Sequence, residues 1–392
     1  MNILFLSKDY PPYLIGGVGV YVYEMSRLLA WMGHKVYVIT KTDETPCVYL
    51  DAGVRVYRVK PKRIAFWNGL RGKVGGFLER LEYSLAVSKK LKEVVKENHI
   101  DIVETCEARA EAFWYYLFHR KPLLVVKLHT PETVAFKMDH VLGTLDYRLI
   151  KLLEEHWVSR ASLRIGLSSE VVDITARHFS LKLANVPLMP NPINLELFKP
   201  SLSGAAEDRL GILYVGRLEF RKGIHTLLKA FVHVQDEFPY AHLTLIGSDC
   251  GMRCYMEKKI KELKYPECVR WIDYLPREEL VKHYQENAVC VVPSLWENYP
   301  YVCLEALACG KAVVASSVGG LKKIIQHGFN GILTPPGSAK SLGEAIVKLL
   351  KEEQLRKQLG SAARVSIEKE YAPELIANRA IEIYEKILNK KR

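Results

Sequence analysis

The chain has 392 residues, of which 49% are hydrophobic and 26% are charged, and its formal net charge is +12. This length predicts two domains of ordinary size, and this composition excludes a disordered or fibrous chain. The positive charge fits an anionic ligand, an anionic membrane surface or nucleic acid, and by itself it selects none of the three.

No segment of the sequence is typical of a membrane-spanning helix, which needs a run of about 18 apolar residues. The first predicted strand follows Met1 directly and has no basic leader, so it is not typical of a signal peptide. We therefore expect a cytoplasmic protein, and the inner face of a membrane is a second location that the sequence allows.

Strands and helices alternate along the first half of the chain. The predicted strands are short apolar runs, at residues 3–7, 35–40, 54–59, 102–104, 123–128 and 163–166. Segments with helical patterns lie between them, such as 19–31 and 77–97. This alternation predicts a parallel sheet that is covered by helices on both faces.

One segment of the first half is both basic and aromatic. No acid occurs between Asp51 and Glu79. The basic and aromatic residues of this segment are Arg55, Arg58, Lys60, Lys62, Arg63, Phe66, Trp67, Arg71, Lys73 and Phe77. One interpretation is a surface for an anionic acceptor or for peripheral membrane contact through residues 55–77. The other is an ordinary solvated loop whose aromatic side chains pack into the core.

A linker and a second alternating pattern follow. Residues 186–192 and 201–204 are rich in Pro, Ser and Gly, which is typical of a linker. The predicted strands after it are 211–216, 243–247, 269–272, 289–293, 312–316 and 331–334, and the predicted helices are 223–238, 256–263, 277–286, 301–309 and 339–352. We expect an α/β fold of two facing Rossmann-like, doubly wound domains, with the ligand at the carboxyl ends of their strands.

The C-terminal tail is predicted to be a long amphipathic helix over residues 373–390. Its apolar positions, among them Ile376 and Ile383, need a partner surface. We expect this helix to cross back onto the first domain. The predicted domains are therefore residues 1–190 together with 373–392, and residues 205–372.

The eight cysteines show no spacing typical of a disulfide framework or of a structural zinc site. Cys106, Cys290, Cys303 and Cys309 lie in apolar stretches and are predicted to be small core residues. No Asp-x-Asp pair occurs in the chain either. We therefore expect no bound metal ion.

The most informative segment runs from Glu297 to Glu305. Pro300 suits the first turn of a helix, and the apolar run that follows ends at Gly310. Glu305 lies inside this apolar helix, where a carboxylate needs hydrogen-bond donors because burying it bare is unfavourable. Both acids could bind a hydroxyl-rich ligand such as a sugar nucleotide. The alternative is one buried glutamate held by backbone amides and one unrelated surface glutamate.

A second informative segment, from Gly216 to Gly223, follows a predicted strand and opens a helix. Arg217 and Lys222 could bind one anion there, because a guanidinium and an amine both suit phosphate oxygens and a helix begins beside them. The alternative is a solvated basic loop that pairs with Glu219. The location after a strand favours the phosphate site.

Three further features are weaker evidence for a binding site when each is considered alone. Gly16 and Gly17 lie between a strand and a helix, and their amides could approach phosphate or sugar, although a flexible turn explains them equally well. His129 ends a strand and could bind a sugar hydroxyl, or it could be a satisfied histidine at the rim. Gly319 and Gly320 are interpreted first as a turn.

Taken in order, these motifs resemble those of the retaining family-4 glycosyltransferases, which have the GT-B fold. The likeness covers nearly the whole chain. Glu297 and Glu305 match the Glu-x7-Glu signature of the family. The segment from Gly216 to Gly223 matches its phosphate loop, Gly16 and Gly17 match its N-terminal glycine loop, and His129 matches its histidine in the first domain.

The resemblance implies a hexosyl transfer from a nucleotide-diphosphate sugar, with no other cofactor. Arg217 and Lys222 would hold the diphosphate, Glu305 the ribose, and Glu297 the hydroxyls of the donor sugar. The amides of Asn298 and Tyr299 would lie close to that sugar. His129 would line the sugar site, and Gly17 would approach the phosphate. The catalytic candidates are Glu297, His129, Arg217 and Lys222.

The sequence also departs from the family pattern. Asn298 and Tyr299 stand where Gly and Phe are common, and Lys323 and Ser338 replace frequent acids. None of these changes removes an expected phosphate or ribose ligand. No protein nucleophile stands out, so we expect attack from the face of the leaving group, with the leaving phosphate accepting the proton.

Three other functions are compatible with parts of the pattern. A sugar phosphorylase or a sugar-nucleotide epimerase could use the same two-domain scaffold. A nucleic-acid-binding protein is suggested by charge alone, and the sequence lacks the basic helix or aromatic platform of that class, so we expect no nucleic-acid partner. The acceptor could be a saccharide, a lipid-linked saccharide or a small molecule.

Overall fold

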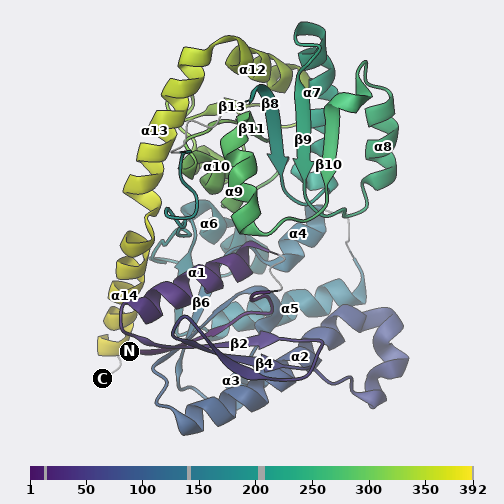
Figure 1. Cartoon of the computed structure of the whole chain (residues 1–392). Helices are drawn as coiled ribbons and strands as arrows, with labels where there is room; N and C mark the ends of the chain where they lie inside the picture. The colour runs from purple at the N-terminus through teal and green to yellow at the C-terminus, as the bar shows by residue number, and fades with distance from the viewer. Residues whose placement is uncertain (13–15, 139–142, 202–207, 391–392) are drawn as a thin grey trace. The chain divides into compact units, whose positions relative to one another are not determined.

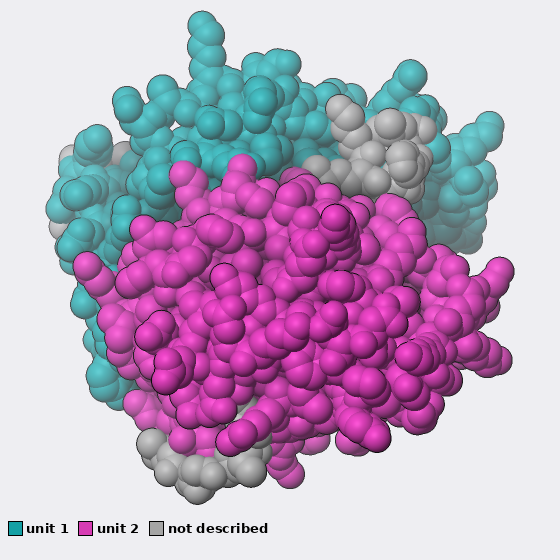
Figure 2. All heavy atoms as spheres, turned by 90° about the horizontal axis from the view of Figure 1, so that it is seen from above, with its two compact units in different colours: residues 1–192, 373–392 teal, residues 193–372 magenta. Residues whose placement is uncertain are grey.

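The computed structural model describes residues 1–12, 16–138, 143–201 and 208–390. It divides the chain into two compact units, each built around one sheet (Figure 1). Unit 1 comprises Met1–Pro192 and Pro373–Arg392, and unit 2 comprises Ile193–Ala372 (Figure 2). The predicted α/β fold with two doubly wound domains is confirmed. Part of the predicted linker, residues 202–204, lies outside the described residues.

The sheet of unit 1 has seven strands in the order β3-β4-β2-β1-β5-β6-β7. These strands are β1 (Asn2–Leu6), β2 (Lys35–Lys41), β3 (Val48–Asp51), β4 (Val54–Val59), β5 (Ile102–Cys106), β6 (Leu123–Leu128) and β7 (Leu163–Gly166). Every neighbouring pair is parallel except β3 with β4, which is antiparallel. β5 and β6 are buried along their whole length, which explains their continuous apolar runs.

The sequence analysis does not predict β3. This strand lies at the edge of the sheet, and the side chains of Val48 and Leu50 are exposed. An edge strand with solvent on one face gives a weaker apolar signal than the central strands do. β5 is also longer than predicted, because Thr105 and Cys106 continue the pairing with β6.

The helices of unit 1 are α1 (Gly17–Trp31), α2 (Arg71–Glu97), α3 (Phe113–Phe118), α4 (Glu132–Met138), α5 (Leu145–Arg160), α6 (Ser169–Phe179) and α14 (Pro373–Lys390), with the short 3₁₀ helices η1 (Ala65–Leu70) and η2 (Ala108–Ala110). α2 begins six residues earlier than the predicted 77, and it bends at Val74. α14 has its predicted limits and packs against α1, so the tail belongs to unit 1 as expected. None of the described helices is both long and apolar enough to cross a membrane.

The sheet of unit 2 has six parallel strands in the order β10-β9-β8-β11-β12-β13. They are β8 (Asp208–Val215), β9 (His242–Ile246), β10 (Val269–Ile272), β11 (Asn287–Val292), β12 (Ala312–Ser316) and β13 (Ile332–Thr334). The helices are η3 (Phe220–Lys222), α7 (Ile224–Glu237), α8 (Arg253–Lys261), η4 (Pro266–Cys268), α9 (Arg277–Glu286), α10 (Tyr301–Ala308), α11 (Leu321–Ile324), α12 (Ala339–Lys351) and α13 (Glu353–Tyr371).

The strand order reverses once in each sheet. The reversal lies between β1 and β5 in unit 1, and between β8 and β11 in unit 2. In open α/β sheets, ligands bind beyond the carboxyl ends of the strands at such a reversal. The loops that follow these four strands are therefore the places where a functional site is expected, and the candidate residues of the sequence lie on or beside them.

Candidate active site

Lys222 is positioned by a tight connection between β8 and α7 in unit 2. Gly216 follows β8 with a φ of 150°, and Gly223 joins η3 to α7 with a φ of 73°. A Cβ atom at Gly223 would collide with the carbonyl oxygen of Pro293, which follows β11. Glycine therefore lets the end of η3 lie directly against the loop after β11. Lys222, one residue earlier, meets that loop.

Lys222 and Glu297 form an ion pair at the reversal between β8 and β11. The amine of Lys222 donates to Oε1 of Glu297, and the hydroxyl of Ser294 donates to the same oxygen at 3.0 Å. Glu297 is only 5% exposed. The alternative interpretation of Glu297 as a surface glutamate is therefore wrong, because its carboxylate is buried between two donors from neighbouring loops.

Gly319 and Gly320, after β12, support the loop that carries Glu297. A Cβ atom at Gly319 would collide with the carbonyl oxygen of Glu297, and one at Gly320 would collide with that of Asn298. The amide of Gly320 also donates to the Glu297 carbonyl oxygen at 3.1 Å. The sequence analysis interpreted these glycines first as a turn, and the structure adds a close backbone approach that only glycine permits.

Asn298 and Tyr299 continue this loop toward α10. The hydroxyl of Tyr299 lies 3.0 Å from that of Tyr371 at the end of α13, so the ring is directed toward that helix. Pro300 is the residue before the first helical residue, Tyr301, one position earlier than the predicted first turn. The backbone at 298–300 thus lies at the N-terminus of α10.

Glu305 is buried inside α10, and two side chains of α9 hold its carboxylate. Arg277 donates to Oε1 of Glu305 through Nε at 3.2 Å, and its Nη2 lies 3.1 Å from the same oxygen. The hydroxyl of Tyr284 donates to Oε2 at 3.0 Å. The prediction that this carboxylate needs donors is confirmed. Arg277 and Tyr284, both on α9, are site residues that the sequence analysis missed.

Arg217 is the more exposed of the two predicted phosphate ligands, with 47% of its side chain accessible against 18% for Lys222. Its Nη2 lies 3.3 Å from Oε1 of Glu219, and Arg221 donates to the same oxygen at 2.6 Å. The alternative interpretation, a basic loop that pairs with Glu219, therefore describes Arg217 but not Lys222. An exposed pair of this kind is weak, so a bound anion could compete for the guanidinium.

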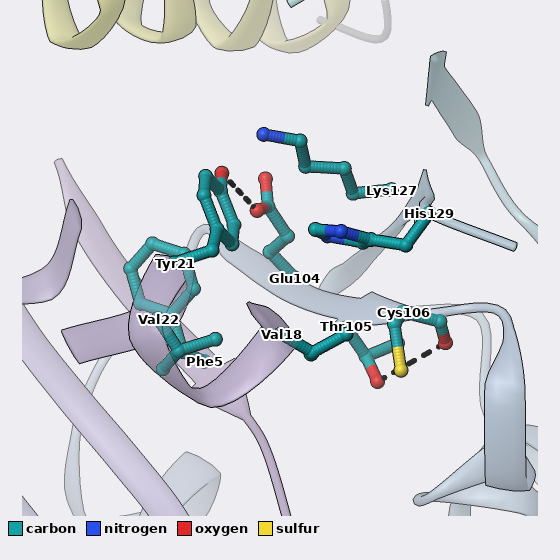
Figure 3. Close-up of a pocket in the computed structure, with 9 residues that line it drawn as sticks. All are labelled: Phe5, Val18, Tyr21, Val22, Glu104, Thr105, Cys106, Lys127 and His129. Carbon is teal, nitrogen blue, oxygen red and sulfur yellow. Dashed lines mark hydrogen bonds between the residues drawn. The ribbon is translucent and has the colours of Figure 1, made fainter. Parts of the chain in front are cut away.

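In unit 1, His129 follows β6 and lines a small pocket with Tyr21, Glu104 and Lys127 (Figure 3). Its ring lies edge-on to the ring of Tyr21, with centroids 5.4 Å apart, and its amide donates to Oε2 of Glu107 at 3.0 Å. Burial, and secondarily the nearby Lys127, lower the pKa of His129 well below its ordinary value. The imidazole is therefore neutral and can both donate and accept a hydrogen bond.

The same pocket contains a buried lysine, Lys127, and a buried glutamate, Glu104. The amine of Lys127 lies 3.4 Å from the centroid of the Tyr21 ring and donates to Oδ1 of Asn191 at 3.3 Å. Burial lowers the pKa of Lys127 to about 7, against the opposing effect of Glu104. Glu104 accepts hydrogen bonds from Tyr21 at 2.6 Å and from Tyr384 on α14, and burial raises its pKa.

Gly16 and Gly17 lie at the start of α1, where both are exposed. Val18, the next residue, lines the same pocket as His129. The structure thus brings the glycine loop and His129 to the same end of the unit 1 sheet. No group of three His, Cys, Asp or Glu side chains that could hold a metal ion occurs within the described parts of the chain.

Two family models match the chain, one over most of unit 1 and the other over most of unit 2. The model described as Glycosyltransferase Family 4 matches residues 15–197, and the model described as Glycosyl transferases group 1 matches residues 199–366. The second match contains the Lys222–Glu297 pair and Glu305. The chain belongs to the group 1 glycosyltransferases. It is therefore an enzyme that transfers a glycosyl group, as the resemblance implied.

Curated proteins and solved structures agree with this family. A glycosyltransferase of Methanocaldococcus jannaschii, itself uncharacterized, is 27% identical, and the match covers 98% of each chain. The sucrose-phosphate synthase of Thermosynechococcus elongatus has the same fold, with a TM-score of 0.82, 24% identity and 99% of each chain covered. The Anabaena protein HepE, solved in complex with UDP-glucose, has a TM-score of 0.74 at 19% identity, over 98% of this chain and 100% of that one.

Proposed function

We propose that this glycosyltransferase moves a hexosyl group from a nucleotide-diphosphate sugar to a saccharide, a lipid-linked saccharide or a small molecule. The transfer would retain the anomeric configuration and use no metal ion. The observation that carries the proposal is the Lys222–Glu297 pair at the reversal between β8 and β11. Ligands of open α/β sheets bind at this position, and the pair offers a cation for phosphate beside a carboxylate for hydroxyl groups.

The diphosphate would bind at Lys222 and Arg217. Both cations lie on the connection after β8, and both are paired with carboxylates in the structure. A diphosphate would compete with Glu297 for the amine and with Glu219 for the guanidinium. Its negative charge grows as the glycosidic bond breaks, so these cations would stabilise the transition state more than the bound donor.

The hydroxyl groups of the donor would bind at the carboxylates. Glu297 would accept from the sugar once Lys222 turns toward the diphosphate, with the amides of Asn298 and Tyr299 beside it. Glu305 would accept from the ribose, and Arg277 and Tyr284 already hold its carboxylate in one orientation. We also propose that His129 of unit 1 contacts the sugar and that Gly16 and Gly17 approach the phosphate. The neutral imidazole of His129 suits a hydroxyl partner.

A retaining mechanism without a protein nucleophile fits these contacts. Glu297 is held by Lys222 and Ser294, and Glu305 by Arg277 and Tyr284, so each carboxylate has donors that reduce its nucleophilicity. In the proposed reaction the acceptor oxygen forms a bond to the anomeric carbon on the face from which the diphosphate departs. The bond to the diphosphate oxygen breaks, and that oxygen takes the proton of the acceptor hydroxyl.

The partners of the enzyme follow from the same proposal. The donor would be a nucleotide sugar, and HepE supports this because a protein of the same fold was solved with UDP-glucose. For residues 55–77 we propose an anionic partner, which is either the acceptor or the inner surface of a membrane.

Thermal unfolding with a panel of sugar nucleotides tests the donor site first. A donor that binds the folded chain raises its melting temperature, and the best donor is then incubated with candidate acceptors. Proton NMR of the first-formed product gives its anomeric configuration. We expect a stabilising donor and a product with the configuration of that donor. A product of inverted configuration would overturn the retaining mechanism, and a sugar phosphate or an epimer would overturn the transfer.

A further inference from the structure

We infer that residues 60–73 of unit 1 form a surface that binds membranes containing anionic lipids. The surface consists of four basic and two apolar side chains, all exposed: Lys60, Lys62, Arg63, Phe66, Leu70 and Lys73. It lies on η1, on the segment before it and on the first turn of α2. We call this set the 60–73 surface.

The structure narrows the basic segment that the sequence analysis identified. Arg58 is buried and donates to the backbone oxygens of Lys41 and Tyr10, so it belongs to the core of unit 1. Arg71 forms an ion pair with the buried carboxylate of Glu82. The predicted set 55–77 was therefore too wide, because two of its cations hold the fold together and are not offered to a partner.

The apolar side chains of the surface are exposed to solvent. Phe66 is 89% exposed and Leu70 is 50% exposed, and η1 has no buried residue at all. The alternative interpretation, in which the aromatic side chains pack into the core, is therefore wrong for Phe66. Phe66 and Leu70 thus leave two large apolar side chains of one short helix available to an apolar partner.

The surface is held in place by unit 1. Oε1 of Glu82 on α2 accepts a hydrogen bond from the amide of Ile64 at 2.6 Å, and it also accepts from Arg71. One buried carboxylate thus fixes the entry to η1 and the start of α2 together. Phe66 and Leu70 are presented by a segment that is tied to the long helix behind it, so little ordering of the backbone is required on binding.

The basic and apolar side chains of the 60–73 surface together indicate which class of partner it binds. Lys60, Lys62, Arg63 and Lys73 make no ion pair with an acid within the described part of the chain. Basic side chains are attracted to anionic headgroups, and exposed aromatic and aliphatic side chains enter the boundary between headgroups and acyl chains. A soluble polyanion would satisfy the cations and leave Phe66 and Leu70 in water. A lipid surface satisfies both sets.

A second basic region of the chain provides a matched contrast. Lys258, Lys261 and Lys264 lie on or just after α8 in unit 2 and are exposed. Acids lie among them, at Glu257 and Glu262, and no exposed large apolar side chain lies on α8. This region has the character of an ordinary solvated helix face.

Sedimentation of the full chain with lipid vesicles tests the inference without any donor or acceptor. The probes are vesicles of phosphatidylcholine alone and vesicles that contain about 30% of the anionic lipid phosphatidylglycerol, whose surface potential attracts basic side chains. Variants Phe66→Ser/Leu70→Ser and Lys60→Glu/Lys62→Glu/Arg63→Glu are compared with the wild type. The matched controls are Tyr240→Ser, an exposed aromatic of unit 2, and Lys258→Glu/Lys261→Glu/Lys264→Glu, which changes the charge equally.

We expect the wild type to bind the anionic vesicles and to leave the neutral ones unbound. The charge-reversal variant of the surface should lose roughly 10²-fold in partitioning and the Phe66/Leu70 variant roughly tenfold, while both controls stay within about twofold of the wild type. Equal losses in the two charge-reversal variants would overturn the inference. So would tight binding to a soluble anionic polysaccharide without vesicle binding. Circular dichroism confirms that each variant is folded, and a failed donor assay would leave these results unchanged.

Discussion

The carboxyl ends of the two sheets are built from different kinds of polar groups. In unit 2, Lys222 and Glu297 form an ion pair, and Arg217 beside them reaches solvent. In unit 1, the buried Lys127 and the half-buried His129 have pKa values that burial lowers, and the buried Glu107 has one that burial raises to about 8. One edge thus keeps its charges in ion pairs, and the other favours uncharged forms.

This difference matches the chemistry that we propose. A leaving diphosphate gains charge, so cations that can leave a carboxylate partner for the ligand suit unit 2. Hydroxyl groups carry no charge, and neutral donors and acceptors in a fixed geometry suit them better. The pocket of unit 1 is fixed by Tyr384 of α14, which donates to Glu104 on β5, so residues 280 positions apart hold the same site.

The largest effect is expected when the cation of unit 2 is removed. Lys222→Ala should lower transfer by roughly 10²-fold or more, the scale of one strong charge-stabilising contact. Steady-state rates of product formation measure it. Lys229→Ala, an exposed lysine of α7 in the same unit, is the matched control and should leave the rate unchanged. If the two variants behaved alike, Lys222 would have no part in holding the diphosphate.

The next largest effect, on the free energy of unfolding, is expected when the hydrogen bond between α14 and β5 is removed. Tyr384→Phe removes a hydrogen bond to the buried carboxyl of Glu104 and should lower the free energy of unfolding of unit 1 by about 2 kcal/mol. Denaturation by urea, followed through a probe in unit 1, measures the change. Tyr240→Phe removes an exposed hydroxyl and serves as the control. A loss no greater than that of the control would show that this bond contributes nothing.

The preference of the unit 1 site for uncharged forms should make the stability of the protein depend on pH. Burial raises the pKa of Glu107 to about 8 from an ordinary 4.5, so the folded chain binds more protons than the unfolded chain between these values. The contribution of Glu107 to stability should therefore be lost as the pH rises from 4.5 to 8. Glu107→Gln should remove up to about 1.4 kcal/mol per pH unit of this slope. Urea unfolding at pH 5.5, 6.5 and 7.5 measures it, and an unchanged slope would mean that Glu107 does not titrate in this range.

The smallest expected effect concerns the orientation of Glu305. Arg277→Lys keeps the charge but loses the two-nitrogen contact with the carboxylate, so KM for the donor should rise roughly fivefold while kcat changes little. A donor that lacks the ribose hydroxyl groups should show no such rise. Arg253→Lys, whose guanidinium lies over Trp271, is the control. Equal rises with both donors would show that Arg277 does not act through Glu305.

Much of the fold follows from the sequence, because central strands of a parallel sheet are continuous apolar runs and the tail has a clear helical period. The elements that the sequence analysis did not predict have a weaker apolar pattern. β3 is an exposed edge strand. α13 is predominantly polar, and its buried apolar residues Leu359, Ala363, Ile367 and Tyr371 form only a single narrow row, which is a weak apolar signal. The start of α2 contains Gly72, Gly75 and Gly76, which lower its predicted helicity.

The candidate site was predictable in its acids and cations but not in their partners. The location of Glu305 in an apolar helix showed that it needs donors. That these are Arg277 and Tyr284 depends on how α9 packs against α10, which no local pattern reveals. The pairing of Lys222 with Glu297 likewise joins loops 75 residues apart. The closeness of Gly319 and Gly320 to that loop is also a property of the folded sheet.

The central claim is that Lys222 and Glu297 mark the place where unit 2 binds a diphosphate. Calorimetric titration tests it most directly, with the nucleoside diphosphate of the best donor compared with its nucleoside. The account predicts that the wild type prefers the diphosphate by roughly 10²-fold and that Lys222→Met loses most of this preference while nucleoside binding persists. Equal affinity for both ligands in the wild type, or a preference that survives in Lys222→Met, would contradict it.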